Sequence, residues 1–137
     1  MTQWNPYLTF DGNCREAMLF YQYSLGGQLL MQTVGETPMA EKLPQNIQHF
    51  ILHASLSVNH NLLMGSDLVC DKGLNKGNSV AIALHCSSEI EINKYYSSLS
   101  AKGQINQPLS ESHWGTLFGD ITDQFGVHWF LYYDKKN

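Results

Sequence analysis

The sequence predicts an α+β protein built from two tandem βαβββ repeats. Residues 11–28 (DGNCREAMLFYQYSLGGQ) and 87–104 (SSEIEINKYYSSLSAKGQ) share one design: a polar opening, a double aromatic, a Ser-Leu pair and a Gly-Gln exit. Each copy follows one strand-like run and precedes several more. The copies lie about 75 residues apart. That spacing fits two half-domains better than a solenoid, whose units recur every 20 to 50 residues or so.

The length and composition narrow the class of protein. A chain of 137 residues is expected to form a single domain with its own core. Within this domain, 1–137, we expect repeat 1 at about 5–69, a linker at about 70–78 and repeat 2 at about 79–133. Apolar residues make up 43%, charged residues 15%, and the net charge is −4, which argues against disorder and against a basic nucleic-acid surface.

The cysteines and the absence of long apolar runs indicate a cytoplasmic protein. Cys14, Cys70 and Cys86 are odd in number and widely spaced, so they form neither a disulfide framework nor a CxxC metal site. We expect buried or half-buried thiols. No apolar run reaches about 18 residues, and no basic segment precedes an apolar one, so neither a membrane span nor a signal peptide is expected.

The first repeat begins with an alternating strand at 5–10, which ends in a turn-rich Asp-Gly-Asn cluster. Asn13 followed by Glu16 predicts a capping box at the start of a helix. Gly26-Gly27 predicts the end of this helix, and residues 28–35 read as the second strand.

Residues 36–48 contain two prolines and break the strand pattern. They are predicted to form a loop with at most one helical turn. This loop is either a wall of a binding pocket or a mobile surface excursion. Strands at 49–58 and 62–69 follow, joined by a hairpin turn at 59–61. Residues 70–78 show no periodicity and read as the linker.

The second repeat shows the same order of elements. We expect a strand at 79–86, a helix at 88–101, a strand at 104–109, a turn at 110–115, and strands at 116–122 and 127–133. The whole chain is therefore predicted to contain two helices and eight strands, with four strands in each half.

Alternation along the strands predicts a polar sheet face that could bind a ligand. One face of the strands at 5–10, 49–58 and 79–85 is consistently apolar and can pack on the helices. The opposite face carries small, polar or aromatic residues: Asn5, Tyr7, Thr9, Ile51, His53, Ser55, Ser57, Ser79, Ala81, Ala83 and His85. Such a face suits a concave ligand surface. The alternative is an ordinary solvated sheet.

His53 is the most distinctive residue of this polar face. An imidazole in the middle of a strand suits a metal ligand, a proton carrier or a hydrogen-bonded wall. Since no carboxylate lies near it in sequence, the structural role is the simpler interpretation. His49 has the same parity, but it lies about 13 Å away along the strand, so the two cannot share a metal.

A second aromatic group, formed by His113, Trp114 and Trp129, lies in the last quarter of the chain. Trp129 either lines a concavity, where it could stack on a planar or cationic ligand, or belongs to the core. Asp120 and Asp123 flank a turn and are expected to cap it. No phosphate-binding glycine loop or known catalytic motif is present, and Cys86 would need a neighbouring base to act as a nucleophile.

Three segments resemble the PhnB-like family of the glyoxalase, bleomycin-resistance and extradiol-dioxygenase superfamily, also called vicinal oxygen chelate. They are the opening PYLTFDGNCREAMLFY with its LGG exit, the middle HASLSVNHNLLMGSD and the closing SHWGTLFGDITDQFGVHWFL. The resemblance covers nearly the whole chain. It implies a glyoxalase-like open curved sheet or half-barrel with the helices on the outer face, in a homodimer. Members are often labelled 3-demethylubiquinone 3-methyltransferase, but this sequence has no S-adenosylmethionine-binding glycine loop.

The resemblance also bears on metal binding. In metal-dependent members four inward positions hold His and Glu ligands, and these positions correspond here to Asn5, His53, Ser79 and Leu131. Only His53 is a competent ligand, whereas such sites normally need three or more protein donors. No metal and no other cofactor is therefore expected, with a divalent ion as the less favoured alternative.

Three functional hypotheses follow. The first is a metal-free small-molecule-binding protein with a site lined by Tyr7, Thr9, His53, Ser55, Ser79, Trp114 and Trp129. The second is a metal-dependent lyase, isomerase or dioxygenase-type enzyme in which His53 is the catalytic candidate, completed by Glu36, Glu41 or His113. The third is a dimeric scaffold with a vestigial cavity. None of them calls for a nucleic-acid or membrane partner.

Overall fold

A computed structural model describes residues 2–69 and 72–135 of the chain. The chain divides into two compact units, Met1–Asn75 and Lys76–Asn137. This division falls inside the stretch that the sequence predicts as a linker. Cys70 lies outside the described residues. Among the described residues, no helix is long and apolar enough to cross a membrane.

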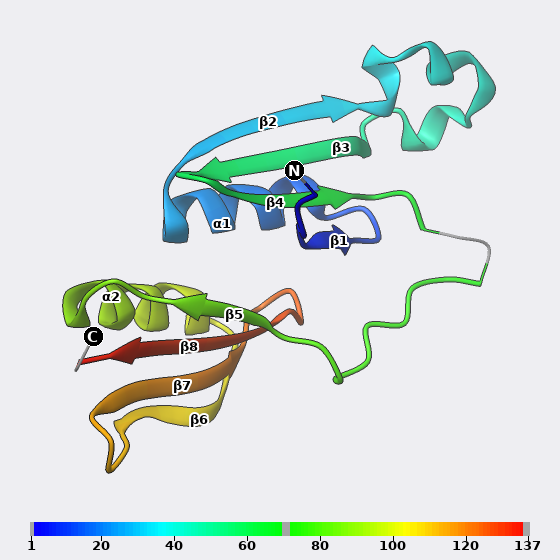
Figure 1. The fold of residues 1–137 in the computed structure, drawn as a ribbon. Helices are drawn as coiled ribbons and strands as arrows, with labels where there is room; N and C mark the ends of the chain where they lie inside the picture. Colours follow the sequence, from blue (N-terminus) through cyan, green and yellow to red (C-terminus); the bar gives the residue numbers. More distant parts are fainter. Residues whose placement is uncertain (1, 70–71, 136–137) are drawn as a thin grey trace. The chain divides into compact units, whose positions relative to one another are not determined.

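The first unit is a four-stranded sheet with one α-helix. Its elements are β1 (Tyr7–Thr9), α1 (Cys14–Leu25), β2 (Gln28–Thr33), β3 (Ile51–Val58) and β4 (Asn61–Ser66). The strand order is β1-β4-β3-β2, and only the β1–β4 pair is parallel (Figure 1).

The connection between β2 and β3 contains more helical structure than predicted. It forms three 3-10 turns: η1 (Val34–Glu36), η2 (Pro38–Lys42) and η3 (Gln45–Ile47). The side-chain amide of Gln48 donates a hydrogen bond to the backbone carbonyl of Ala40 (2.9 Å), and the carbonyl of Gln48 accepts one from Gly35 N–H (2.8 Å). These bonds across the loop hold its two ends together.

The second unit repeats the design of the first. Its elements are β5 (Ile82–His85), α2 (Glu89–Ser100), β6 (Gln104–Glu111), β7 (Thr116–Thr122) and β8 (His128–Asp134). The strand order β5-β8-β7-β6, with a parallel β5–β8 pair, matches the order of the first sheet. The α+β fold of two βαβββ repeats is confirmed, and each sheet is open. The main difference from the prediction is that β5 begins at Ile82, so Ser79 precedes the strand.

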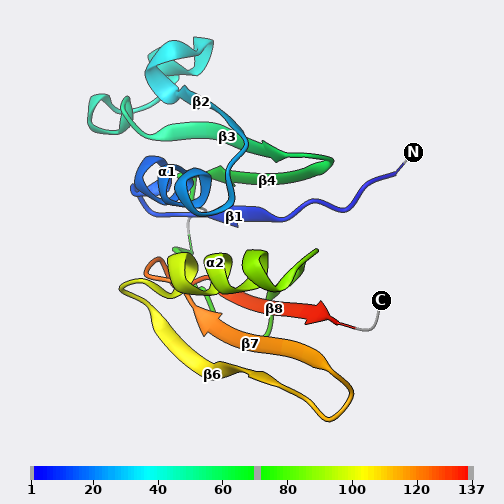
Figure 2. The same cartoon turned by 90° about the vertical axis from the view of Figure 1, so that its left-hand side faces the viewer.

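Each helix covers one face of its own sheet (Figure 2). In the first unit, Gly65 of β4 permits the close approach, because a Cβ atom there would lie 3.2 Å from the Cys14 sulfur and 3.3 Å from the Met18 sulfur. In the second unit, a Cβ atom at Gly119 of β7 would lie 3.3 Å from the Tyr96 ring. These two glycines mark the helix-covered faces, and the opposite faces have no helix of their own unit upon them.

The first helix is capped by a distant carboxylate and not by the predicted capping box. Asn13 makes no capping bond through its side chain. Instead, one carboxylate oxygen of Asp67 accepts hydrogen bonds from the N–H groups of Gly12 and Cys14, both at 2.9 Å. The other oxygen accepts one from Ile51 N–H at 2.8 Å. Asp67 is only 3% exposed, so this buried carboxylate joins the starts of α1 and β3 to the end of β4.

The second helix begins with a local cap. The Ser88 hydroxyl accepts a hydrogen bond from Glu91 N–H (3.1 Å), and the Glu91 carboxylate accepts one from Ser87 N–H (2.9 Å). This reciprocal arrangement is a variant of the capping box. The two repeats therefore begin their helices in different ways.

Asp123 caps the turn between β7 and β8, as predicted. Its Oδ1 accepts hydrogen bonds from the N–H groups of Phe125 (2.8 Å) and Val127 (3.1 Å). Its Oδ2 accepts one from the indole N–H of Trp129 at 2.8 Å. The same buried carboxylate thus shapes the turn and orients the largest side chain of the second core.

Cys14 and Cys86 are buried thiols. Burial raises the pKa of each to about 12, and the nearby carboxylates of Asp67 and Glu91, respectively, act in the same direction. Since the thiolate is the reactive form, neither cysteine is suited to act as a nucleophile near neutral pH.

We expect Asp67→Asn to lower the free energy of unfolding by about 2–4 kcal/mol. The amide replaces one of the two acceptor oxygens with an NH₂ group, so a backbone N–H on that side would lose its acceptor and face another donor. The control is Asp11→Asn, which removes the same charge from an exposed position just before α1. Urea unfolding followed by circular dichroism measures both. Equal stability of the two variants would show that the Asp67 bonds contribute little.

We also expect Cys14 and Cys86 to react with a maleimide at pH 8 at least about 100-fold more slowly in the native protein than in urea. With a pKa of about 12, the thiolate fraction at pH 8 is smaller by roughly three orders of magnitude than for an unperturbed thiol. Reactivity should rise with pH above 9, as more thiolate forms. Peptide-resolved mass spectrometry gives each rate, and native labelling of Cys86 as fast as in urea would contradict its burial.

Candidate functional site

The helix-free face of the first sheet brings four of the predicted site residues together. Gly65 and its cross-strand partner Ala54 face α1, so the neighbouring positions on each strand face the opposite way. Register with β4 places Leu8 opposite Gly65 and Tyr7 opposite Met64. The residues that share the helix-free face are Tyr7, Thr9, His53 and Ser55. The alternation in β1 and β3 predicted this set correctly.

The exposed side chain of His53 lies beside an aromatic ring. The centroids of the Tyr7 and His53 rings are 6.1 Å apart, with an angle of 31° between the ring planes. Gln32 of β2 is the cross-strand neighbour of His53 on the other side. An imidazole, a phenol and an amide therefore share one patch of the sheet surface.

Apolar side chains lie next to these polar groups. Leu30, Ser55, Met64 and Tyr7 form one continuous row across β2, β3, β4 and β1. Leu30 is 64% exposed and Tyr7 is 51% exposed, so this row presents apolar area to solvent. We call His53 together with this row and Thr9 the His53 face. A mainly apolar surface with a few placed polar groups is typical of small-molecule sites.

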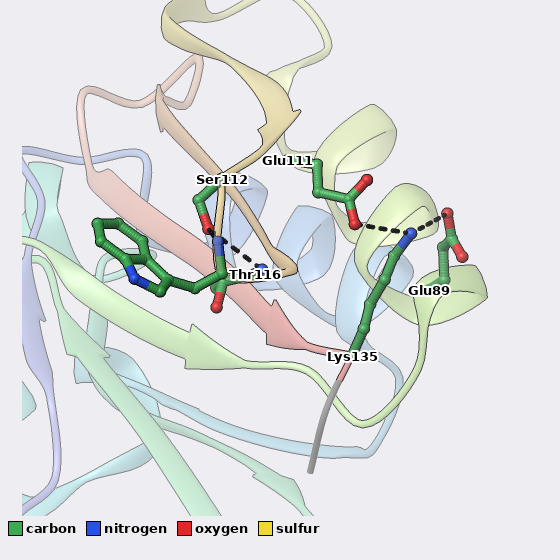
Figure 3. Close-up of polar contacts among 6 residues, drawn as sticks. Glu89, Glu111, Ser112, Thr116 and Lys135 are labelled. Atoms are coloured by element: carbon green, nitrogen blue, oxygen red, sulfur yellow. Dashed lines mark hydrogen bonds and ion pairs between the residues drawn. The ribbon is translucent and has the colours of Figure 1, made fainter.

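Two further predicted site residues, Ser79 and Trp114, belong to the second unit, and both are exposed. Ser79 is exposed and precedes β5. Trp114 is 74% exposed and lies with His113 in the turn between β6 and β7. The Ser112 hydroxyl accepts hydrogen bonds from the N–H groups of Trp114 (3.3 Å) and Thr116 (3.2 Å), and so holds this turn (Figure 3).

Lys135 adds ion pairs to this end of the second sheet. Its ammonium group lies 3.3 Å from a Glu111 carboxylate oxygen and 3.7 Å from one of Glu89 (Figure 3). Hydrogen bonding to Glu111 is the largest influence that raises the pKa of Lys135. The lysine links the first turn of α2 to the end of β6, which is a structural role.

Of the two positions predicted for Trp129, on the ligand face or in the core, the structure shows the core. Trp129 is 1% exposed and pairs with buried Ile121, while Leu131 pairs with Gly119, whose position abuts α2. Both residues of β8 therefore face the helix. Leu131 lies in the core and does not occupy the inward position that the resemblance assigned to it.

The other alternation of β8 carries aromatic residues that are not among the predicted site residues. Tyr132 stacks on His85 of β5, with centroids 4.5 Å apart and planes at 11°. Phe130 lies 5.9 Å from Tyr132 and 6.3 Å from Phe118 of β7. We call these four rings, His85, Tyr132, Phe130 and Phe118, the ring row. Because both alternations of VHWFLYY are aromatic, the sequence alone does not indicate which one faces the helix.

A polar group flanks the ring row. Asn106 Nδ2 donates hydrogen bonds to Asp120 Oδ1 (3.2 Å) and Thr122 Oγ1 (2.9 Å). Asp120 is the cross-strand partner of Phe130. The Asp120 carboxylate is thus held at the edge of the ring row.

The side chains present do not fit the superfamily's metal site. Across residues 2–69 and 72–135, no three His, Cys, Asp or Glu side chains are grouped to hold a metal ion. Asn5 precedes β1 and is half-buried. The Glu36 carboxylate accepts a hydrogen bond from the Thr33 hydroxyl (2.9 Å), and Glu41 is exposed in η2. Neither glutamate belongs to a group of three such donors with His53.

Comparison with known proteins shows matches over almost the full length. A family model described as 3-demethylubiquinone-9 3-methyltransferase matches residues 2–132. Protein YjdN of Escherichia coli K12 is 32% identical over 136 residues, which cover 93% of this chain and 92% of that protein. The crystal structure of PA1353 from Pseudomonas aeruginosa is 34% identical, covers 98% of both chains and has a TM-score of 0.87.

Two more distant structures share the fold. A putative 3-demethylubiquinone-9 3-methyltransferase, the PhnB protein from Bacillus cereus, has a TM-score of 0.73 at 22% identity and covers 96% of this chain and 99% of that one. A glyoxalase/bleomycin resistance protein/dioxygenase family enzyme from Burkholderia phytofirmans has a TM-score of 0.63 at 9% identity, with 93% and 96% covered. With its glyoxalase-like fold and these matches over its length, the chain belongs to the PhnB-like family, whose model is described as 3-demethylubiquinone-9 3-methyltransferase.

Proposed function

We propose that this chain is a small-molecule-binding protein that holds its ligand on the His53 face without a divalent metal. The observation that carries the proposal is the convergence of Tyr7, Thr9, His53 and Ser55 on the helix-free face of the first sheet. His53 is exposed in mid-strand beside the Tyr7 ring, so its imidazole is accessible to a ligand.

The chemistry of the His53 face suits a ligand with two kinds of surface. An apolar or flat body would lie against Tyr7, Met64 and Leu30. Its polar groups would reach the imidazole of His53 and the hydroxyl groups of Thr9 and Ser55, each of which can donate or accept a hydrogen bond. Such a division between apolar area and a few placed polar groups gives both affinity and orientation.

The donor set supports binding over metal chemistry. His53 is the single metal-binding side chain among the residues that the resemblance aligns with the ligands, and Leu131, one of those residues, lies in the core. The described residues place His53 in no group of three potential metal donors. A single imidazole does not retain a divalent ion, because stable sites use three or more protein donors.

The test is a screen of small aromatic and polar compounds by saturation-transfer NMR, repeated with two histidine variants. We expect His53→Ala to weaken the hits by about tenfold or more, because it removes a hydrogen bond and a stacking partner. His60→Ala, at the exposed turn between β3 and β4, is the matched control and should leave affinity unchanged.

Titration of the same proteins with Ni, Zn, Mn and Fe(II) separates binding from enzyme chemistry. We expect no stoichiometric binding at micromolar concentrations. Tight uptake of one ion per chain that is lost in His53→Ala would reject the metal-free proposal in favour of a metal-dependent enzyme. Hits that bind His53→Ala as well as the native chain would remove His53 from the site.

A further inference from the structure

The sheet of the first unit has one long edge strand that lacks the usual protection against pairing. β2 is the outermost strand in the order β1-β4-β3-β2, so among the described residues it pairs with β3 alone (Figure 1). Every second residue of such a strand directs its N–H and C=O groups away from the sheet. The sequence of β2, QLLMQT, contains neither a charged residue nor a proline. Leu30, near its middle, is 64% exposed.

The other three edge strands of the described sheets are short or interrupted. β1 has three residues and β5 has four. β6 is longer, but it contains Pro108 and Glu111, and its register with β7 shifts twice. Short length, proline, charge and bulges are the features that keep edge strands from pairing with other chains. The register of β2 with β3 is regular from Gln28 to Gln32. Of the four edges, β2 is therefore the one suited to accept another strand.

The order of the side chains along β2 indicates that the added strand is a second β2. Residues 28–32 read QLLMQ, which is nearly the same in both directions. If two antiparallel copies are related by a two-fold axis at Leu30, each Leu30 lies opposite Leu30 of the second copy. Leu29 then lies opposite Met31 of the second copy, and Gln28 lies opposite Gln32. Apolar side chains meet apolar ones, amides meet amides, and no like charges come together.

We propose that β2 is an interface at which two copies of this chain join their first sheets through antiparallel β2 strands. Backbone hydrogen bonds between the strands supply the affinity, and the cross-strand side-chain pairs fix the register. The connection to β3 leaves β2 at the end of the strand, after Thr33, so the central residues of the edge remain available. The inference goes beyond the proposed function, because it holds whether or not the His53 face binds a ligand.

The strand pair forms a weak contact. Two strands of six residues bury less surface than the roughly 1,200–2,000 Å² of a stable interface, so we expect a Kd on the order of 100 µM. Sedimentation velocity of the whole native chain should therefore show a rise in mass between about 10 µM and about 1 mM, on either side of that Kd.

Two lysine substitutions test whether β2 carries this association. Leu30→Lys places two ammonium groups opposite each other at the two-fold axis and should weaken the association about tenfold or more. Ile105→Lys is the matched control, because it adds the same charge to β6, the corresponding edge strand of the second unit, at a residue that is 48% exposed. It should leave the association unchanged. Since both positions are exposed, the urea midpoints of both variants should stay near that of the native chain.

Cysteine cross-linking tests the register. Directly opposite Cβ atoms in antiparallel strands lie about 4.5–5.5 Å apart, so Leu30→Cys should form an intermolecular disulfide between the two positions 30 under mild oxidation. Ile105→Cys should form much less, and Cys70→Ser is included in both variants because Cys14 and Cys86 are already buried. A native mass that stays constant up to about 1 mM, ten times the expected Kd, would overturn the interface. A rise in mass that Leu30→Lys leaves unchanged, or equal cross-linking of the two cysteine variants, would also overturn it.

Discussion

The first unit depends on the buried carboxylate of Asp67. Its three backbone hydrogen bonds join segments that are 16 to 55 residues apart in the chain. They fix where α1 begins relative to β3 and β4, and therefore which sheet face the helix covers. The face that remains open carries His53. A buried charge is stable only when it is fully hydrogen-bonded, so these segments must come together for any of them to be satisfied.

The sequence predicts the fold and half of the candidate site because alternation is informative only where the two faces differ. In β3 one alternation is apolar and the other carries His53 and Ser55, so the prediction is correct. In β8 both alternations are aromatic, so the pattern does not decide whether Trp129 lies on the ligand face or in the core. The role of Asp67 was missed because its partners lie far away in sequence, whereas Asn13 and Glu16 match a local capping pattern that the chain does not use.

The two sheets have the same topology and different surfaces. The first helix-free face combines an imidazole with hydroxyl groups and apolar side chains, and the second combines stacked rings with a carboxylate. Membership of the PhnB-like family accounts for the shared framework. The described residues contain no group of three potential metal donors, so the chemistry of each face has to be derived from its own side chains.

Amide chemical-shift mapping with the best hit of the screen tests the central claim most directly. The account predicts shift changes concentrated on residues of the His53 face, such as Leu30, Ser55 and Met64, with little change at Arg15 and Tyr23 on the exposed side of α1. Changes centred on α1, or spread evenly over both units, would contradict the assignment of the ligand site to the His53 face.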